Sequence, residues 1–390
     1  MEREPICELE NRFSFNVYPK REVVITEGRG ALLFGPSGER YIDCAGGHGV
    51  AAVGHGNEKV AHAIASQAKR LISCPGVFYN DMRAQFLEKL LGFAPEQMIN
   101  AFLCNSGAES IEAALKFARF TTKRTDVVCA MRGFHGRTMG ALSATGTPAY
   151  RELFEPLVQG FSFAPFNHIE RMDALINDRT AAVLIEPVQG EGGVHVGEND
   201  FFQKLRELCT QRGALLIVDE VQTGFCRTGR RFGHEHFDIK PDMICLAKAM
   251  AGGVPMGAVL CAASIESPLG KHGSTFGGNP LACAAGLATI DFMLENNLAR
   301  EAERKGRLFM EMMRSVALPR VRQIRGLGLM IGIELKEKVR PVLTALAEEG
   351  VLALPAGSTV LRLLPPLVIS DEELLTAGEK IIKVLSSAIE

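Results

Sequence analysis

The sequence predicts an α/β fold in which a largely parallel sheet is covered by helices. Two observations support this class. Between about residues 58 and 275, short apolar runs alternate with segments of helical periodicity, which is the order of βαβ units. The runs are hydrophobic throughout, as expected for strands buried on both faces. Six runs are candidate strands: 101–104, 127–130, 182–185, 215–218, 243–246 and 258–261.

The two ends of the chain have a different character. Near the N-terminus, residues 31–34 and 41–43 flank a turn rich in glycine and proline, which predicts a hairpin. A last helix is expected to open at Ser370, with Glu373 at the spacing of a capping box. The other expected C-terminal elements are a long charged helix near 283–315, strands at 329–334, 351–354 and 360–364, and a helix at 340–349.

This pattern divides the chain into a large domain at 58–275 and a smaller α+β domain at 276–390. We expect the N-terminal segment, residues 1–57, to pack with the small domain.

Composition excludes several classes of protein. The 390 residues are 47% hydrophobic and 23% charged, with a net charge of -2 and no basic block, so a nucleic-acid partner is not expected. No stretch is apolar enough to span a membrane, and no signal segment opens the chain. The ten cysteines form no C-x-x-C pair, and the nine histidines form no metal-binding motif. We therefore expect a cytoplasmic protein without a metal site.

Lys248 and Asp219 stand at the carboxyl ends of two predicted strands, where open α/β sheets place their ligands. A lysine can form a Schiff base there, and an aspartate can keep a pyridinium nitrogen protonated, which are the needs of pyridoxal phosphate chemistry. Alternatively, the lysine is a solvated residue at a helix start. The run ending in Asp219 also looks like the magnesium-binding strand of an ATPase, but the chain has no G-x-x-x-x-G-K-[ST] loop.

Two further strand ends carry candidate binding groups. Ser106, Gly107 and Ala108 open a helix, where free N–H groups can bind a phosphate, although ordinary capping by Asn105 or Ser106 explains the same residues.

Phe134 can stack on a flat ring, and Arg137 can hold a substrate carboxylate, unless the segment is only a surface turn. The hydroxyl groups of Ser274 and Thr275 can also reach a phosphate. Arg362 lies inside an apolar strand and needs a partner if it is buried.

Together these segments resemble the class III pyridoxal-phosphate aminotransferases of fold type I, over nearly the whole chain. The resemblance implies a large domain with a mainly parallel seven-stranded sheet, a small α+β domain, pyridoxal 5'-phosphate as cofactor and a homodimer. The motifs that carry it are 105–109, 134–138, 186–193, 217–229, 247–249 and 275–280.

The resemblance also implies the role of each cofactor-binding residue. Lys248 forms the internal aldimine and later moves the substrate proton, and Asp219 pairs with the pyridine nitrogen. Phe134 and Val221 enclose the ring, while Gln222 contacts its hydroxyl group. The phosphate is bound by Ser106, Gly107, Ala108 and, from the other subunit, Thr275.

On the substrate side, the resemblance implies that Arg137, Glu191, Arg362 and Ser274 bind glutamate and the second substrate. Glu191 masks Arg362 when the second substrate has no carboxylate near the reacting amine, and releases it for glutamate.

Within the family, the sequence resembles acetylornithine aminotransferases and their carrier-linked relatives. The latter act on aminoadipate or glutamate semialdehyde bound to a small acidic carrier protein of the LysW type, in lysine and arginine biosynthesis. Residues 46–50, 139–143, 351–354 and 356–357 look more like the carrier-linked branch, and His135 more like the acetylornithine branch. Another ω-aminotransferase, a glutamate-semialdehyde-type aminomutase and a noncatalytic homologue are the remaining alternatives.

Overall fold

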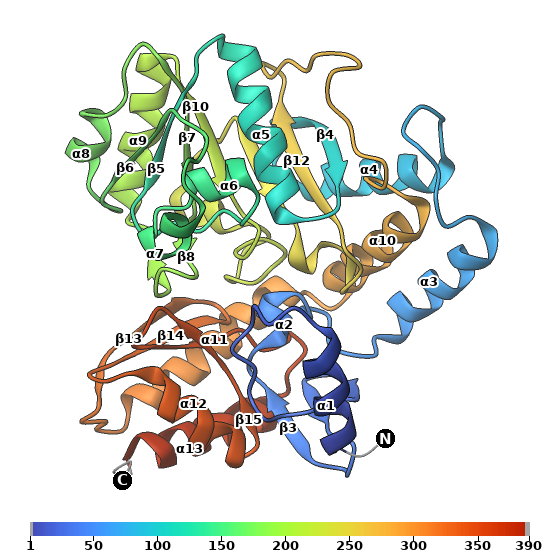
Figure 1. The fold of residues 1–390 in the computed structure, drawn as a ribbon, viewed down its shortest axis with the longest axis vertical. Coiled ribbons are helices and arrows are strands. Elements are labelled where there is room, and N and C mark those ends of the chain that lie inside the picture. The colour runs from blue at the N-terminus through green and yellow to red at the C-terminus, as the bar shows by residue number, and fades with distance from the viewer. Residues whose placement is uncertain (1–2, 387–390) are drawn as a thin grey trace.

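The computed structural model describes residues 3–386 and contains one large sheet with three smaller ones (Figure 1). The large sheet has seven strands in the order β4-β12-β11-β10-β7-β5-β6. Its strands are β4 (Met98–Cys104), β5 (Asp126–Ala130), β6 (Phe161–Ala164), β7 (Thr180–Ile185), β10 (Leu215–Asp219), β11 (Met243–Leu246) and β12 (Gly257–Ala262).

The prediction of a largely parallel sheet is confirmed. All six candidate runs lie within observed strands. Only β12 runs against its neighbours, β11 and β4, so the sheet is mixed. Strand β6 was missed because it is a four-residue edge strand, Phe161–Ala164, whose first three residues are only half-buried. Such a strand lacks the continuous apolar run that marks strands buried on both faces.

Helices cover both faces of the large sheet, because successive strand residues point to opposite sides. In β10, Ile217 packs in the core formed with α5, whereas Leu216 and Val218 pack in the core formed with α9. The helices of this half are α3 (Glu58–Arg70), α4 (Asp81–Phe93), α5 (Gly107–Thr122), α6 (Met139–Ala144), α7 (Pro148–Arg151), α8 (Ile169–Asp173), α9 (Asn199–Arg212) and α10 (Pro280–Glu295). Three 3₁₀ turns and a hairpin complete it: η1 (Glu152–Phe154), η2 (Gly233–Phe237), η3 (Lys248–Ala251), β8 (Val188–Gln189) and β9 (His195–Val196).

The second half of the molecule combines both ends of the chain, drawn blue and orange-red in Figure 1. One four-stranded sheet has the order β1-β2-β3-β15, in which N-terminal β3 pairs in parallel with C-terminal β15. This sheet contains β1 (Glu27–Arg29), β2 (Leu32–Phe34), β3 (Arg40–Asp43) and β15 (Val351–Leu352). The other has the order β13-β14-β17-β16, with β13 (Val321–Leu327), β14 (Met330–Leu335), β16 (Leu354–Ala356) and β17 (Val360–Leu363). Its helices are α1 (Arg3–Phe13), α2 (Gly46–Gly49), α11 (Leu298–Arg314), α12 (Val339–Glu348) and α13 (Asp371–Ser386).

Two expectations for this half were wrong. The long helix expected near 283–315 is two helices, α10 and α11, because Asn297 takes a left-handed conformation with φ of 49° and ends the helical path between them. The single strand expected at 351–354 is divided between two sheets, so that β15 pairs with β3 and β16 pairs with β17. The hairpin near residues 31–43 and the helix near 340–349 are confirmed. The domain limits at 57 and 275 stay predictions.

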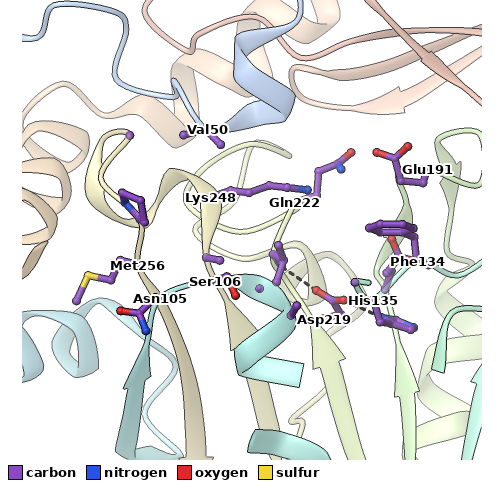
Figure 2. A pocket seen from close by; sticks show the side chains of 18 of the residues that line it. Val50, Asn105, Ser106, Phe134, His135, Glu191, Asp219, Gln222, Lys248 and Met256 are labelled. Carbon is purple, nitrogen blue, oxygen red and sulfur yellow. Dashed lines mark hydrogen bonds and ion pairs between the residues drawn. The ribbon is translucent and has the colours of Figure 1, made fainter. Parts of the chain in front are cut away.

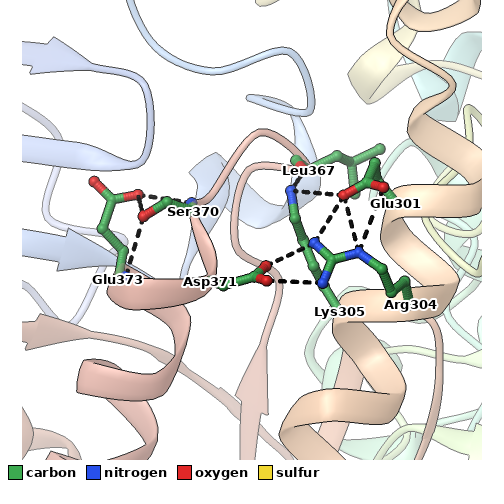
Figure 3. A network of polar contacts seen from close by, with 7 residues as sticks. All are labelled: Glu301, Arg304, Lys305, Leu367, Ser370, Asp371 and Glu373. Carbon is green, nitrogen blue, oxygen red and sulfur yellow. Dashed lines mark hydrogen bonds and ion pairs between the residues drawn. The ribbon is translucent and has the colours of Figure 1, made fainter.

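The last helix is tied to α11 by the polar network in Figure 3. The capping box is confirmed, since the backbone N–H of Glu373 donates to Ser370 Oγ at 3.1 Å and that of Ser370 donates to the Glu373 carboxylate at 2.8 Å. Arg304 on α11 donates both Nη groups to Asp371 at 2.7 and 2.8 Å, in a bidentate pair. These contacts fix the strand-to-helix corner that follows β17.

Candidate active site

A cavity of about 360 Å³ lies at the carboxyl ends of the central strands, where the motifs converge (Figure 2). This is the position at which open α/β sheets bind ligands. Of the residues predicted for the site, nine line it: Ser106, Gly107, Ala108, Phe134, Glu191, Asp219, Val221, Gln222 and Lys248.

Lys248 is presented by an unusual backbone. It follows β11 and adopts φ of 47°, a left-handed conformation that is uncommon outside glycine and is concentrated at functional sites. Its side chain extends across the cavity toward Gln222 in Figure 2. Burial, reinforced by the charge of Arg362, lowers the pKa of the Lys248 amine despite opposing carboxylates. A lowered pKa makes the uncharged form of a lysine, which acts as a nucleophile or a base, easier to reach.

Asp219, at the end of β10, is held by two partners. Its Oδ1 accepts the backbone N–H of Val221 at 3.0 Å, and its Oδ2 lies 2.7 Å from Nδ1 of His135. Burial opposes protonation of His135, but the hydrogen bond and charge of Asp219 raise its pKa overall. The aspartate is therefore held in one orientation with its charge toward the cavity. In the sequence, His135 only resembles the acetylornithine branch, and no sequence spacing links it to Asp219.

Glu186 is a second residue whose role was missed. It lies at the end of β7, and its Oε2 accepts the backbone N–H of Phe134 at 3.0 Å, which fixes the turn that carries the aromatic ring. Burial, together with the charge of Asp219, raises the pKa of Glu186 to about 7, although His135 opposes the rise. In the sequence it is only the first residue of the motif at 186–193.

The start of α5 provides an anion-binding group of N–H donors. Ser106 caps the helix by accepting the N–H of Glu109 at 3.2 Å, so the capping interpretation is correct as well. The N–H groups of Gly107 and Ala108 make no hydrogen bond within residues 3–386 and face the cavity wall. A Cβ at Gly107 would lie 2.8 Å from Val221 Cγ1, so only glycine lets the helix start approach this closely.

These groups fit pyridoxal phosphate. A lysine, an aspartate backed by a histidine, and free N–H groups at the start of a 16-residue helix face one cavity of suitable size. Phe134 and Val221 lie on its walls and can enclose a flat ring. The groups meet the three demands of the cofactor, for an amine, a partner for the ring nitrogen and a phosphate site.

On the substrate side, Arg362 and Glu191 form an ion pair with Nη1 2.6 Å from Oε1. Arg362, from β17, is only 1% exposed at its side chain, and its Nη1 also donates to Gln222 Oε1 at 3.2 Å. The expected partner of the buried arginine is thus present. Burial alone would raise the pKa of Glu191, but Arg362 outweighs burial and lowers it.

Four predicted residues lie outside the lining of the cavity: Arg362, which contacts the lining residues Glu191 and Gln222, and also Arg137, Ser274 and Thr275. Arg137 is exposed beside it, with its guanidinium carbon 4.8 Å from the ring centre of Tyr150. Ser274 accepts the amide N–H of Asn105, a lining residue, at 3.0 Å. Thr275 is exposed. Within residues 3–386, no cluster of three or more side chains suits a metal ion, and no helix is long and apolar enough to cross a membrane.

Comparison with known proteins gives a consistent assignment. Residues 16–385 match the family described as aminotransferase class III. The chain is 46% identical over 370 residues to a LysW-aminoadipate semialdehyde transaminase of Deinococcus radiodurans, covering 94% of this chain and 86% of that protein. It is 44% identical over 386 residues to an acetylornithine aminotransferase of Methanopyrus kandleri, covering 98% of each.

Solved structures agree. The crystal structure of the ornithine aminotransferase from Toxoplasma gondii ME49 superposes with a TM-score of 0.95 at 33% identity, over 99% of this chain and 95% of that one. The acetylornithine aminotransferase of Elizabethkingia anophelis superposes with a TM-score of 0.87 at 31% identity, over 99% of both chains. The chain belongs to the class III aminotransferases, the fold-type I enzymes that depend on pyridoxal phosphate.

Proposed function

We propose that this aminotransferase moves an amino group between glutamate and the terminal aldehyde of a blocked semialdehyde, in lysine or arginine biosynthesis. The observation that carries the proposal is the buried Arg362–Glu191 pair at the edge of the cavity. A cation that can be masked by a carboxylate suits an enzyme whose two substrates differ in carboxylate placement, since neither substrate then leaves a buried charge unpaired.

Each of the predicted cofactor-binding residues would contact a different part of the cofactor. Ser106, Gly107 and Ala108 would hold the phosphate, with Thr275 reaching it from a second subunit in a homodimer. Asp219 would pair with the ring nitrogen, Phe134 and Val221 would enclose the ring, and Gln222 would contact its hydroxyl group. When bound, the cofactor supplies an electron sink for the carbon that loses its proton.

The protein groups then position the substrates and move the proton. The Arg362 guanidinium binds the α-carboxylate of glutamate once Glu191 turns away, and Arg137 holds the distal carboxylate. Lys248 Nζ would move the proton between the substrate carbon and the cofactor. Its lowered pKa is consistent with this role. Ser274 would support the substrate through Asn105, whose amide it already accepts.

For the acceptor, we favour a semialdehyde linked to a small acidic carrier protein, with N-acetylornithine as the alternative. The carrier-type run 46–50 reaches the cavity, since Val50 lines it, and its His48 adopts a left-handed φ of 62° beside the Arg362–Glu191 pair. The exposed cation of Arg137 next to the cavity would favour approach of an acidic partner. The relative named for a LysW-linked substrate is 46% identical to the chain, and the relative named for acetylornithine is 44% identical. A kinetic measurement is therefore needed to decide between the two acceptors.

The deciding experiment compares kcat/KM for acetylornithine with that for carrier-linked lysine or ornithine at low and high salt. We expect the carrier-linked substrate to be used better, because remote contacts contribute binding energy, and its advantage to shrink as salt screens the exposed charges. A preference for acetylornithine at both salt concentrations would establish the alternative.

A further inference from the structure

A second cavity, of about 450 Å³, lies between the two halves of the molecule and shares no lining residue with the first. One wall comes from the segments after β5 and β6, another from the β8–β9 hairpin, and a third from β13 of the small sheet. The residues that matter here are Arg132, Asn167, Gln189, His195, Gln323 and Arg325.

The cavity has an excess of positive charge. Arg325 lies 2.5 Å from Glu334, but the other oxygen of that carboxylate is already 3.0 Å from Arg322. Arg132 has no carboxylate partner within residues 3–386, and its side-chain contact is with His195 Nε2 at 3.4 Å. Arg325 therefore shares its carboxylate with Arg322, which lies outside the cavity lining, and Arg132 has none, in a chain whose net charge is -2.

Two amide oxygens in this cavity are already engaged, whereas N–H donors of Arg132 and His195 are left over. The amide oxygen of Asn167 already accepts a backbone N–H at 3.0 Å, and that of Gln323 accepts from Arg325 at 2.9 Å. Because Arg132 can only donate, His195 Nε2 is the acceptor in their contact, which leaves the hydrogen on Nδ1. The remaining N–H groups of Arg132 and this Nδ1–H have no partner within the described residues, so they suit a ligand rich in acceptors.

The backbone around Arg132 is also specialised. Its φ of 64° is left-handed, which is uncommon for an arginine and is found preferentially at binding sites. A Cβ at Gly192 would lie 2.6 Å from the carbonyl oxygen of Arg132, so the hairpin packs directly on this turn. Arg325 fixes the same hairpin from the other side by donating to the carbonyl oxygen of Gly193 at 2.7 and 3.0 Å.

We propose that this cavity is a binding site for a small anion, a carboxylate or a phosphate, held by Arg132 and His195 next to the positive charge of Arg325. An anion there would tie the turn at Arg132 to the β8–β9 hairpin, whose loop carries Glu191. Bound anion would accordingly change how readily Glu191 leaves Arg362. This second step rests on the proposed function, whereas the binding site itself does not.

Binding is tested on the holoenzyme by following the ring signals of His195 by NMR, assigned with His195→Gln. Burial, with help from Arg325 and Arg132, lowers the pKa of His195 against the weaker pull of Glu334, so a bound anion should raise it. Inorganic phosphate and succinate are titrated separately at constant ionic strength, with chloride as the reference anion. We expect a saturable response and a higher pKa of His195 with one or both anions.

Matched variants separate this site from others. Arg132→Asn removes the charge but tolerates the left-handed backbone, and should weaken binding roughly tenfold or more. Arg132→Lys keeps the charge and should retain much of the affinity. Arg340→Asn, at an exposed position on α12, and Arg137→Ala, beside the first cavity, should both leave the His195 response unchanged.

Each outcome decides part of the proposal. A response that merely follows ionic strength, or that is unchanged in Arg132→Asn, rejects the site. If anions bind as expected but leave the rate of the glutamate half-reaction unaltered, the site stands and its link to Glu191 is rejected. If the unmodified enzyme shows no activity on any of the proposed substrates, the proposed function is overturned, but the anion-binding result is not affected.

Discussion

Asp219 and Arg362 are both buried charged groups beside the same cavity, but they are held in different ways. Asp219 has its partners in loops of the large half, the neighbouring N–H of Val221 and the ring of His135. Arg362 comes from the small sheet and finds its partner, Glu191, in a hairpin of the large half. Within one chain, the cofactor side is therefore formed by the large half alone, whereas the substrate side joins both halves.

The difference suggests a division between a fixed site and an adjustable one. Asp219 is 5% exposed at its side chain and has both oxygens engaged, while Glu191 is 21% exposed and Arg362 leaves its buried Nε without a partner within residues 3–386. A group with spare bonding capacity can exchange partners at lower cost than a fully bonded one. The predictions that follow test this contrast, beginning with the largest effect.

Lys248→Ala should abolish transamination while the protein still binds pyridoxal phosphate. The phosphate and ring contacts come from other residues of the fixed side, so cofactor binding should survive without a covalent link. The measurement combines cofactor content after gel filtration with a multiple-turnover assay, and Lys338→Ala, just before α12, serves as the control. Sustained turnover by Lys248→Ala would show that another residue carries the proton.

Asp219→Asn should lower the rate by roughly 10²–10³-fold, since losing one strong charge-assisted contact costs about 2–4 kcal/mol in the barrier. Because Asp219 belongs to the fixed side, both half-reactions should slow to a similar extent. Each can be followed by stopped-flow absorbance of the cofactor. A change smaller than about threefold would place the partner of the ring nitrogen elsewhere.

Arg362→Ala should instead act unequally on the two half-reactions. Losing hydrogen bonds from a charged group should slow the glutamate half by about 10- to 100-fold, with a much smaller effect on the semialdehyde half. Arg137→Ala is the comparison, since both substrates present a carboxylate to it and both halves should suffer. Equal losses in Arg362→Ala would refute the masking role of Glu191 and, with it, the adjustable side.

The same contrast explains what the sequence could predict. Lys248, Asp219 and the start of α5 each follow a buried strand, and strand ends of a parallel sheet converge, so their proximity follows from the pattern alone. The family resemblance supplied the pairing of Arg362 with Glu191, which are 171 residues apart in the numbering, Arg362 on β17 and Glu191 in the loop between β8 and β9. Nothing in local periodicity links two such residues.

The misses have physical causes of the same kind. The hydrogen bond of His135 to Asp219 depends on how two loops meet, and the break between α10 and α11 depends on one left-handed residue, Asn297. The division of residues 351–356 between two sheets follows because β15 pairs with β3, far away in the chain, while β16 pairs with the neighbouring β17. Local propensity describes single elements, whereas these features are decided by tertiary contacts.

The smallest expected effect concerns pH and the backing of Asp219 by His135. Since Asp219 raises the pKa of His135 in the folded protein, the protonated ring stabilises the fold fully below its ordinary pKa, near 6.5, and this contribution is lost as pH rises through the raised value. His135→Gln keeps a neutral donor, so it should cost about 1 kcal/mol at low pH and less in alkaline solution. Glu186 makes this difference between low and high pH smaller, because removing the His135 charge raises the pKa of the Glu186 carboxyl further.

The measurement is the melting temperature of holoenzyme at pH 6 and pH 9, for the natural protein and for His135→Gln, with exposed His62→Gln on α3 as the control. A gap between the natural protein and His135→Gln that is wider at pH 6 than at pH 9, and absent for His62→Gln, is expected. A gap that widens toward pH 9 would mean that His135 is neutral when it bonds Asp219. The fixed side would then depend on hydrogen-bond geometry alone, without the added charge.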